Sequence, residues 1–248
     1  MKPVFDSCMP RPEVLQGDLR EDLFAARLKD VIERKADPVY QEPTRFFDNT
    51  YPTEGLRLLL DEALMRLAGS KPARNAIIRL ETAFGGGKTH NLIALYHTAN
   101  GYDPGPRFVT PGLAPRPGTV RPVGIVGWDL EPRDGLSHGD VTTFTLWGEL
   151  AYQLGGAPGY ALVAGSDRDR SAPGPALLEQ LIGHRPALIM LDEIARHLRA
   201  AKAVPTATGK SDLAEQTVAF LMSLFEFAAS KEQVVVVFTL ADSSDAFG

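Results

Sequence analysis

The chain has 248 residues, of which 44% are hydrophobic and 23% charged, an ordinary globular composition. Its formal net charge of -5 excludes an overall basic footprint for nucleic acid, although a local basic groove is compatible with it. Cys8 is the single cysteine, which excludes an internal disulfide and a cysteine-rich metal site. The start shows no signal peptide, and no stretch approaches the roughly 20 apolar residues that span a bilayer, so we expect a cytoplasmic protein without a membrane partner.

Residues 1–72 are predicted to form a helical N-terminal region. Residues 18–21 have capping-box spacing, and the apolar residues that follow fall on one helical stripe: Phe24, Leu28, Val31 and Ile32. A second helix is expected to begin after Thr53 and to end at Gly69, because its leucines recur at offsets of three and four. The aromatic-rich segment 43–52 between them is interpreted as a packing element at the helix junction.

Residues 73–248 alternate between strand and helix patterns, which predicts a doubly wound, mainly parallel sheet. Strands are predicted at residues 76–80, 123–128, 187–191 and 234–238. Helices are predicted at residues 89–100, 143–155, 176–182, 194–201 and 213–229. The last helix is apolar nearly all round, including Val218, and is expected to be buried. Segments 101–122 and 165–174 are predicted to be surface loops, because they are rich in turn-forming residues.

A run of glycines leads from the first strand into its helix. Backbone N–H groups of glycines can converge on a polyphosphate, and the helix N-terminus adds a partial positive charge. We therefore assign nucleotide binding to Phe84, Gly85, Gly86, Gly87, Lys88, Thr89 and His90. Lys88 would contact the β- and γ-phosphates, and Thr89 would place its hydroxyl on Mg²⁺.

This run differs from the Walker A pattern G-x-x-x-x-G-K-[ST] at one position, because Thr82 stands where the first glycine is usual. A flexible glycine turn that precedes Lys-Thr is the alternative interpretation of the segment. For His90 the alternative to a phosphate contact is packing on the surface of its helix.

Two carboxylates, Asp192 and Glu193, follow the wholly apolar strand at 187–191, as in a Walker B motif. The C-terminal end of a buried parallel strand lies at the crevice where such sheets bind ligands. We expect Asp192 to hold Mg²⁺ together with Thr89, and Glu193 to orient and polarise the attacking water. A solvated helix N-terminus, where acidic residues are favoured, is the alternative.

Thr239 lies at the end of the strand at 234–238 and is assigned as the sensor of the γ-phosphate, on the expectation that this strand lies between the other two. The catalytic set is thus Glu193, Lys88 and Thr239, and the metal ligands are Thr89 and Asp192. Weaker candidates are a loop with four acids and a histidine at 129–140, interpreted as a solvated turn, and Arg196 and Arg199, which could serve a neighbouring subunit or be ordinary exposed residues. Phe47 or Tyr51 could pack on adenine.

The order of these motifs resembles that of the AAA+ P-loop ATPases. Segments 46–52, 84–97, 145–151 and 243–247 also resemble a large bacterial and archaeal ATPase family, catalogued as the domain of unknown function number four hundred and ninety-nine. Its members tend to be encoded near DNA methyltransferases in phage-defence loci. The resemblance implies an AAA+-like P-loop fold that binds ATP and Mg²⁺. It also implies self-association or a larger complex, with DNA or a defence protein as candidate partners.

The predicted function is ATP binding and hydrolysis that drives conformational change in a larger assembly. The alternative is a nucleotide-dependent switch or scaffold that binds ATP with little hydrolysis. A complete AAA+ core would continue with a fifth strand and a helical lid. We expect both to lie outside this sequence, which ends at Gly248 soon after the fourth strand.

Overall fold

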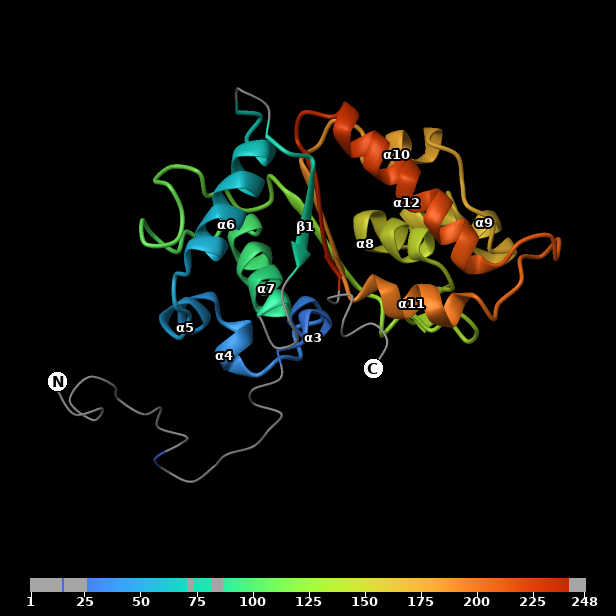
Figure 1. Cartoon of the computed structure of the whole chain (residues 1–248), viewed down its shortest axis with the longest axis horizontal. Helices are drawn as coiled ribbons and strands as arrows, with labels where there is room; N and C mark the ends of the chain where they lie inside the picture. Colours follow the sequence, from blue (N-terminus) through green and yellow to red (C-terminus); the bar gives the residue numbers. More distant parts are fainter. Residues whose placement is uncertain (1–14, 16–25, 71–73, 82–86, 241–248) are drawn as a thin grey trace.

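The computed structural model of the chain describes residue 15 and residues 26–70, 74–81 and 87–240. One parallel sheet has the strand order β1-β6-β5-β2. Its strands are β1 Ile77–Glu81, β2 Arg121–Val126, β5 Ala187–Asp192 and β6 Val234–Leu240. Helices lie on both sides of the sheet (Figure 1), so the predicted α/β fold with a parallel sheet flanked by helices is confirmed.

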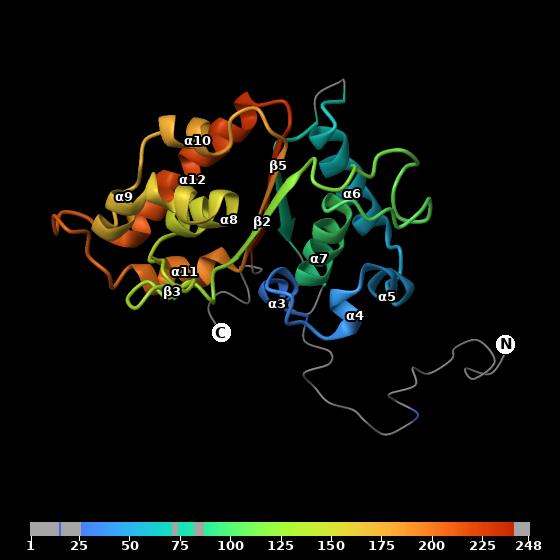
Figure 2. The ribbon, with the colours of Figure 1, turned by 180° about the vertical axis from the view of Figure 1, so that it is seen from behind.

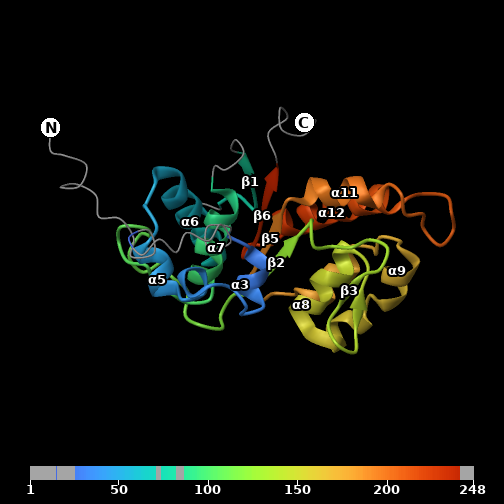
Figure 3. The ribbon, with the colours of Figure 1, turned by 90° about the horizontal axis from the view of Figure 1, so that it is seen from below.

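One face of the sheet is covered by helices that precede β1 and by the helix that follows it (Figure 2). These are α3 Leu28–Ile32, α4 Pro38–Gln41, α5 Pro43–Asp48, α6 Glu54–Leu67 and α7 Lys88–Ala99. The other face is covered by helices that follow β2 and β5 (Figure 3). These are α8 Leu146–Ala161, α9 Ala164–Asp169, α10 Ala176–Leu181, α11 Ile194–Ala201 and α12 Leu213–Ser230.

The central strand β5 is buried along its whole length, which explains its uninterrupted apolar sequence. Leu188 and Met190 pack into the core on the α7 side, whereas Ile189 and Leu191 pack into the core on the α8 side. Successive side chains of a strand point to opposite faces, so both cores need apolar residues from the same strand. Polar groups are therefore confined to the ends of β5.

Local signals in the sequence determine the bounds of α6. The Thr53 hydroxyl accepts a hydrogen bond from the Leu56 N–H at 3.2 Å, and Gly69, with φ of 67°, follows the last turn. The aromatic segment before it is helix α5, where Phe46 and Phe47 are buried. The prediction of a capped helix from Thr53 to Gly69 is confirmed. The predicted cap at residues 18–21 lies outside the described residues.

Strand β2 ends two residues earlier than predicted, and Trp128 is 65% exposed rather than buried in a strand. The chain turns at Gly127, whose N–H donates to the Asp192 carbonyl at 2.7 Å. A Cβ at Gly127 would lie 2.5 Å from the Glu193 carbonyl oxygen, so only glycine allows this close approach. The turn directs Trp128 away from the sheet.

The segment at 129–140 was predicted to be a solvated turn, which is wrong for its second half. Strand β3 Leu136–Ser137 pairs with β4 Thr142–Thr143, and His138 bonds to the buried Glu149. Helix α8 accordingly begins at Leu146 rather than at 143, because Thr145 caps it by accepting the Gly148 N–H at 3.0 Å.

Two other predictions about exposure were wrong. Segment 165–174 was expected to be an exposed loop, but it contains most of α9 and the fully buried Asp167. Helix α12 was expected to be buried all round, but Val218 is 46% exposed and Met222 60% exposed. Among the described residues, no helix combines the length and the apolar character needed to cross a bilayer.

Asp167 joins α9 to the start of α8. Its carboxylate accepts the Thr145 hydroxyl at 2.5 Å, the Tyr160 hydroxyl at 2.9 Å and the Phe144 N–H at 3.1 Å. Burial raises the pKa of Asp167 despite these bonds, and burial together with this carboxylate raises the pKa of Tyr160 to about 12. The cluster supplies the polar partners that a buried charge requires.

We expect Asp167→Ala to lower the free energy of unfolding by about 3 kcal/mol, because it removes the acceptor of the buried Thr145 hydroxyl and of the Phe144 N–H and one of the two acceptors of the Tyr160 hydroxyl. Since the folded pKa is raised, the contribution of Asp167 to stability is greatest below its unfolded pKa of about 4 and declines as pH rises through the folded pKa. As pH rises from the unfolded pKa through the folded pKa, the free energy of unfolding of Asp167→Asn should therefore rise relative to that of the parent chain. Urea unfolding at several pH values measures this difference. Asp169→Asn, at an exposed position, is the control. Parallel pH profiles for the parent and Asp167→Asn would contradict this account.

Candidate functional site

Asp192 is the centre of the candidate site. It ends β5, is 2% exposed, and accepts one hydroxyl on each carboxylate oxygen. Thr89 Oγ1 donates to Oδ2 at 2.8 Å, and Thr239 Oγ1 donates to Oδ1 at 2.7 Å. Because Thr89 lies in the first turn of α7 and Thr239 on β6, the carboxylate connects three elements at one edge of the sheet.

The strand order explains why these residues meet. Strand β6 lies between β1 and β5, so Thr239 stands beside the end of β5, and α7, which begins soon after β1, points its N-terminus at the same edge. The prediction that the strand of Thr239 lies between the strand before the glycine run and the Asp192 strand is confirmed by this order. Thr239 is not at a free strand tip, however, because β6 continues to Leu240 and Thr239 is buried.

The N-terminus of α7 begins at Gly87, which has φ of 75° in the left-handed region. A residue with a side chain is strained in that conformation, so the glycine at this cap position has a structural reason. Lys88 and Thr89 are the first two residues of the helix. The other proposed nucleotide-binding residues of this run, Phe84, Gly85 and Gly86, lie outside the described residues.

Glu193 turns the chain from β5 into α11. It is a non-glycine residue with φ of 50°, a conformation that costs about 1 kcal/mol or more. Its N–H donates to Thr239 Oγ1 at 2.9 Å, and its carboxylate lies 3.6 Å from the Arg196 guanidinium. The strained turn places the two consecutive acids in different settings, with Asp192 buried and Glu193 at the surface.

A cavity of about 390 Å³ opens beside these acids. Thr89, Asp192 and Glu193 line one side, and the start of α3 lines another with Arg27 and Lys29. The cavity therefore presents oxygen ligands next to cationic side chains. We call it the Asp192 cleft.

The sequence did not reveal the contact between Trp128 and Arg196, both of which line the Asp192 cleft. The Arg196 guanidinium lies over the Trp128 ring, 4.5 Å from its centroid, an arrangement that attracts a cation to an aromatic face. Asp129 is also part of the wall, 3.3 Å from Arg27 and 3.9 Å from Lys29. The only sequence signal for this wall is Trp128, an aromatic residue that follows a strand and a glycine. Trp128 was predicted to be part of that strand.

The contacts described for His90 are those of the packing alternative. Its ring stacks on Phe46 with centroids 4.4 Å apart, and its Nε2 lies 2.8 Å from the Thr50 hydroxyl. Phe47 is buried against Tyr102 and Phe108, which agrees with the packing interpretation of the aromatic segment. Tyr51 is 80% exposed, and Arg199 lies on the exposed side of α11.

The oxygen atoms at Asp192 suit a hard cation as metal ligands, because a threonine hydroxyl and a carboxylate are ligands that Mg²⁺ prefers. Within the described part of the chain, no group of three or more His, Cys, Asp or Glu residues is arranged to hold a metal. A magnesium ion at Asp192 would accordingly take most of its ligands from a bound phosphate or from water.

The fold and site together define an α/β protein with a four-stranded parallel sheet and a buried carboxylate at the end of an inner strand. Among protein-family models, that of the DUF499 N-terminal domain matches residues 5–104 and 127–246, which is most of the chain. The chain belongs to the DUF499 family, which confirms the predicted membership of domain of unknown function number four hundred and ninety-nine. No match was found among curated proteins.

The hydroxyl of Thr239 is expected to contribute to stability. Thr239→Val keeps the volume but leaves Asp192 Oδ1 and the Glu193 N–H without this partner, so it should lower the free energy of unfolding by about 2–3 kcal/mol. Thr239→Ser should lose about 1 kcal/mol, because it keeps the hydroxyl and loses one methyl group.

Both Thr239 variants can be compared by urea unfolding at neutral pH. Thr217→Val is the matched control, since among the described residues the buried Thr217 hydroxyl bonds only to the Leu213 carbonyl in its own helix. A Thr239→Val variant as stable as Thr239→Ser would show that the hydroxyl network contributes nothing.

Proposed function

We propose that this chain is a P-loop ATPase of the AAA+ kind that binds Mg-ATP and hydrolyses it. The observation that carries the proposal is the pair of hydrogen bonds from Thr89 and Thr239 to Asp192. In P-loop NTPases, the threonine of the phosphate loop and an aspartate at the end of a nearby strand hold the magnesium ion. Here Thr89 Oγ1 lies 2.8 Å from Asp192 Oδ2, and Gly87 and Lys88 precede Thr89 at the N-terminus of α7.

In this proposal, each described residue of the site has its own role in ATP binding or hydrolysis. Lys88 would hold the β- and γ-phosphates, and the N-terminus of α7 would add its partial positive charge. The magnesium ion would supply charge neutralisation on the phosphate oxygens. Glu193, more exposed than Asp192 and beside the Asp192 cleft, would orient the attacking water. Thr239 would hold Asp192 and the Glu193 backbone at a fixed spacing.

A switch that binds ATP with little hydrolysis remains the second candidate, and one contact favours it. The Glu193 carboxylate lies 3.6 Å from Arg196, whose guanidinium also covers Trp128. A carboxylate that is paired with a cation is less available to position a water molecule than an unpaired one. Hydrolysis would therefore require Glu193 to leave Arg196.

The biological setting proposed here rests on the resemblance alone. We propose that the chain acts in the cytoplasm, in a self-associated or larger complex whose conformation changes with the nucleotide. DNA or a phage-defence protein is the partner that this resemblance suggests.

Hydrolysis predicts different behaviour for two variants. Lys88→Ala should weaken ATP binding by at least about tenfold, because it removes the phosphate-binding cation. Glu193→Gln should bind ATP within about twofold of the parent but turn it over at least about 100-fold more slowly, because an amide cannot accept the proton of water. Binding is measured by titration calorimetry with Mg-ATP, and turnover by phosphate release.

Glu226→Gln, at an exposed position on α12, is the control for the loss of a surface charge. Tight ATP binding with equal, negligible turnover in the parent chain and in Glu193→Gln would replace hydrolysis by the switch. Failure of the parent chain to bind ATP would reject both.

A further inference from the structure

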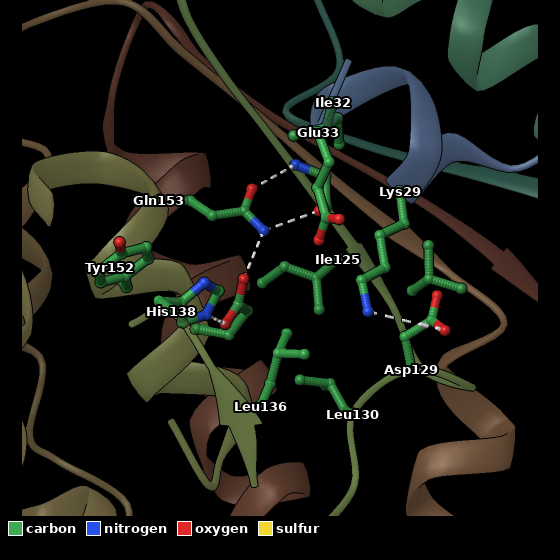
Figure 4. A pocket seen from close by; sticks show the side chains of 13 residues that line it. Lys29, Ile32, Glu33, Ile125, Asp129, Leu130, Leu136, His138, Tyr152 and Gln153 are labelled. Atoms are coloured by element: carbon green, nitrogen blue, oxygen red, sulfur yellow. Dashed lines mark hydrogen bonds and ion pairs between the residues drawn. The ribbon is translucent and has the colours of Figure 1, made fainter. Parts of the chain in front are cut away.

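A second cavity, of about 170 Å³, lies beside the edge strand β2, between α3 and α8 (Figure 4). Its walls are largely apolar and include Ile32, Ile125, Leu130 and Leu136. The stacked rings of His138 and Tyr152, with centroids 4.0 Å apart, form another side. We call it the β2 cavity. A volume of this order accommodates one six-membered ring, since an engineered apolar cavity of about 150 Å³ binds benzene.

The polar groups at the inner end of the β2 cavity are already paired with one another. Glu149 is 3% exposed and accepts from Thr143 at 2.8 Å and from Gln153 Nε2 at 2.8 Å, while His138 Nε2 lies 2.7 Å from it. The Gln153 amide also bonds both the N–H and the carbonyl of Gly124 on β2. This side chain occupies the strand edge at Gly124, so the cavity is suited to a small molecule rather than to an added β-strand.

Two side chains, Lys29 on α3 and Glu33 directly after this helix, reach into the cavity on the opposite side (Figure 4). Lys29 faces Asp129 at 3.9 Å, so its charge is partly balanced inside the cavity. The ion-pair partner of Glu33 is Lys35, which is not part of the lining and has a side chain that is 70% exposed. A surface pair of this kind is weak and easily exchanged.

The charges around the β2 cavity therefore favour a cation. The hydrogen bond from Lys35 lowers the pKa of Glu33, and the charge of Lys29 lowers it further, so Glu33 is an anion at neutral pH. With Lys29 beside Asp129 and Glu149 paired with His138, Glu33 is the carboxylate best placed to accept a new partner.

We propose that the β2 cavity binds a small molecule that carries one apolar ring and a primary ammonium group. The ring would lie against Ile125 and Leu136 beside the His138 ring, and the ammonium would bond to Glu33. This site is distinct from the Asp192 cleft, although Lys29, Val126 and Asp129 line both cavities. The proposal does not depend on ATP binding.

The probe is phenethylamine, compared with three ring compounds of similar size: neutral 2-phenylethanol, anionic 3-phenylpropanoate and zwitterionic L-phenylalanine. Binding to the whole chain is measured by titration calorimetry and by ligand-observed NMR. Phenethylamine should bind at least about tenfold more tightly than each of the others, because a hydrogen bond to a charged group is worth at least that factor. Equal or tighter binding of any comparison compound, or no binding of phenethylamine, would overturn the proposal.

Two variants locate the site. Glu33→Gln should weaken phenethylamine binding about tenfold and leave the affinity for 2-phenylethanol unchanged, whereas Glu226→Gln on α12 should change neither. Leu136→Phe should fill the cavity and abolish binding of both compounds, with circular dichroism confirming that the variant is folded. Unchanged phenethylamine affinity in Glu33→Gln, or in folded Leu136→Phe, would show that the amine does not bind in the β2 cavity.

Discussion

The arrangement of the Asp192 cleft depends on one buried carboxylate. A charged group that is 2% exposed is stable only when its oxygens are bonded, and Asp192 obtains these bonds from Thr89 and Thr239. The requirement fixes the N-terminus of α7 and the end of β6 relative to β5. Because Thr239 also accepts the Glu193 N–H, the same network sets the backbone of the second acid. The polar pairing thus positions the whole edge of the sheet.

The sheet explains why this chemistry is concentrated at one edge. Strand β5 supplies apolar side chains to two cores, so no polar side chain fits within it. A charged residue can therefore lie only at the end of β5. The parallel neighbours β6 and β2 end close to the same point. Groups distant in the sequence then converge without a dedicated loop. This is the physical reason that crevices at the carboxyl ends of parallel strands serve as binding sites.

The features that sequence predicted well have local causes. The apolar run of β5, the Thr53 cap and the α11 span of 194–201 each follow from neighbouring residues. The features that it missed are polar groups buried by distant partners, such as Asp167 with Thr145 and Glu149 with His138. A carboxylate that is buried by pairing has the same local sequence as one in a solvated turn. Periodicity cannot distinguish the two, so the β2 cavity and the Trp128–Arg196 contact emerge only from the fold.

Helix α3 connects the two cavities physically. Lys29 and Asp129 line both of them, and Arg27 bonds to Asp129 on the side of the Asp192 cleft. A cation bound at Glu33 would repel Lys29, which faces Asp129 on that shared wall. Occupancy of one cavity would then change the electrostatic field in the other, and any such coupling acts equally in both directions. Lys29 on α3 and Glu33, which directly follows this helix, carry opposite charges one turn apart and are sufficient to provide this link.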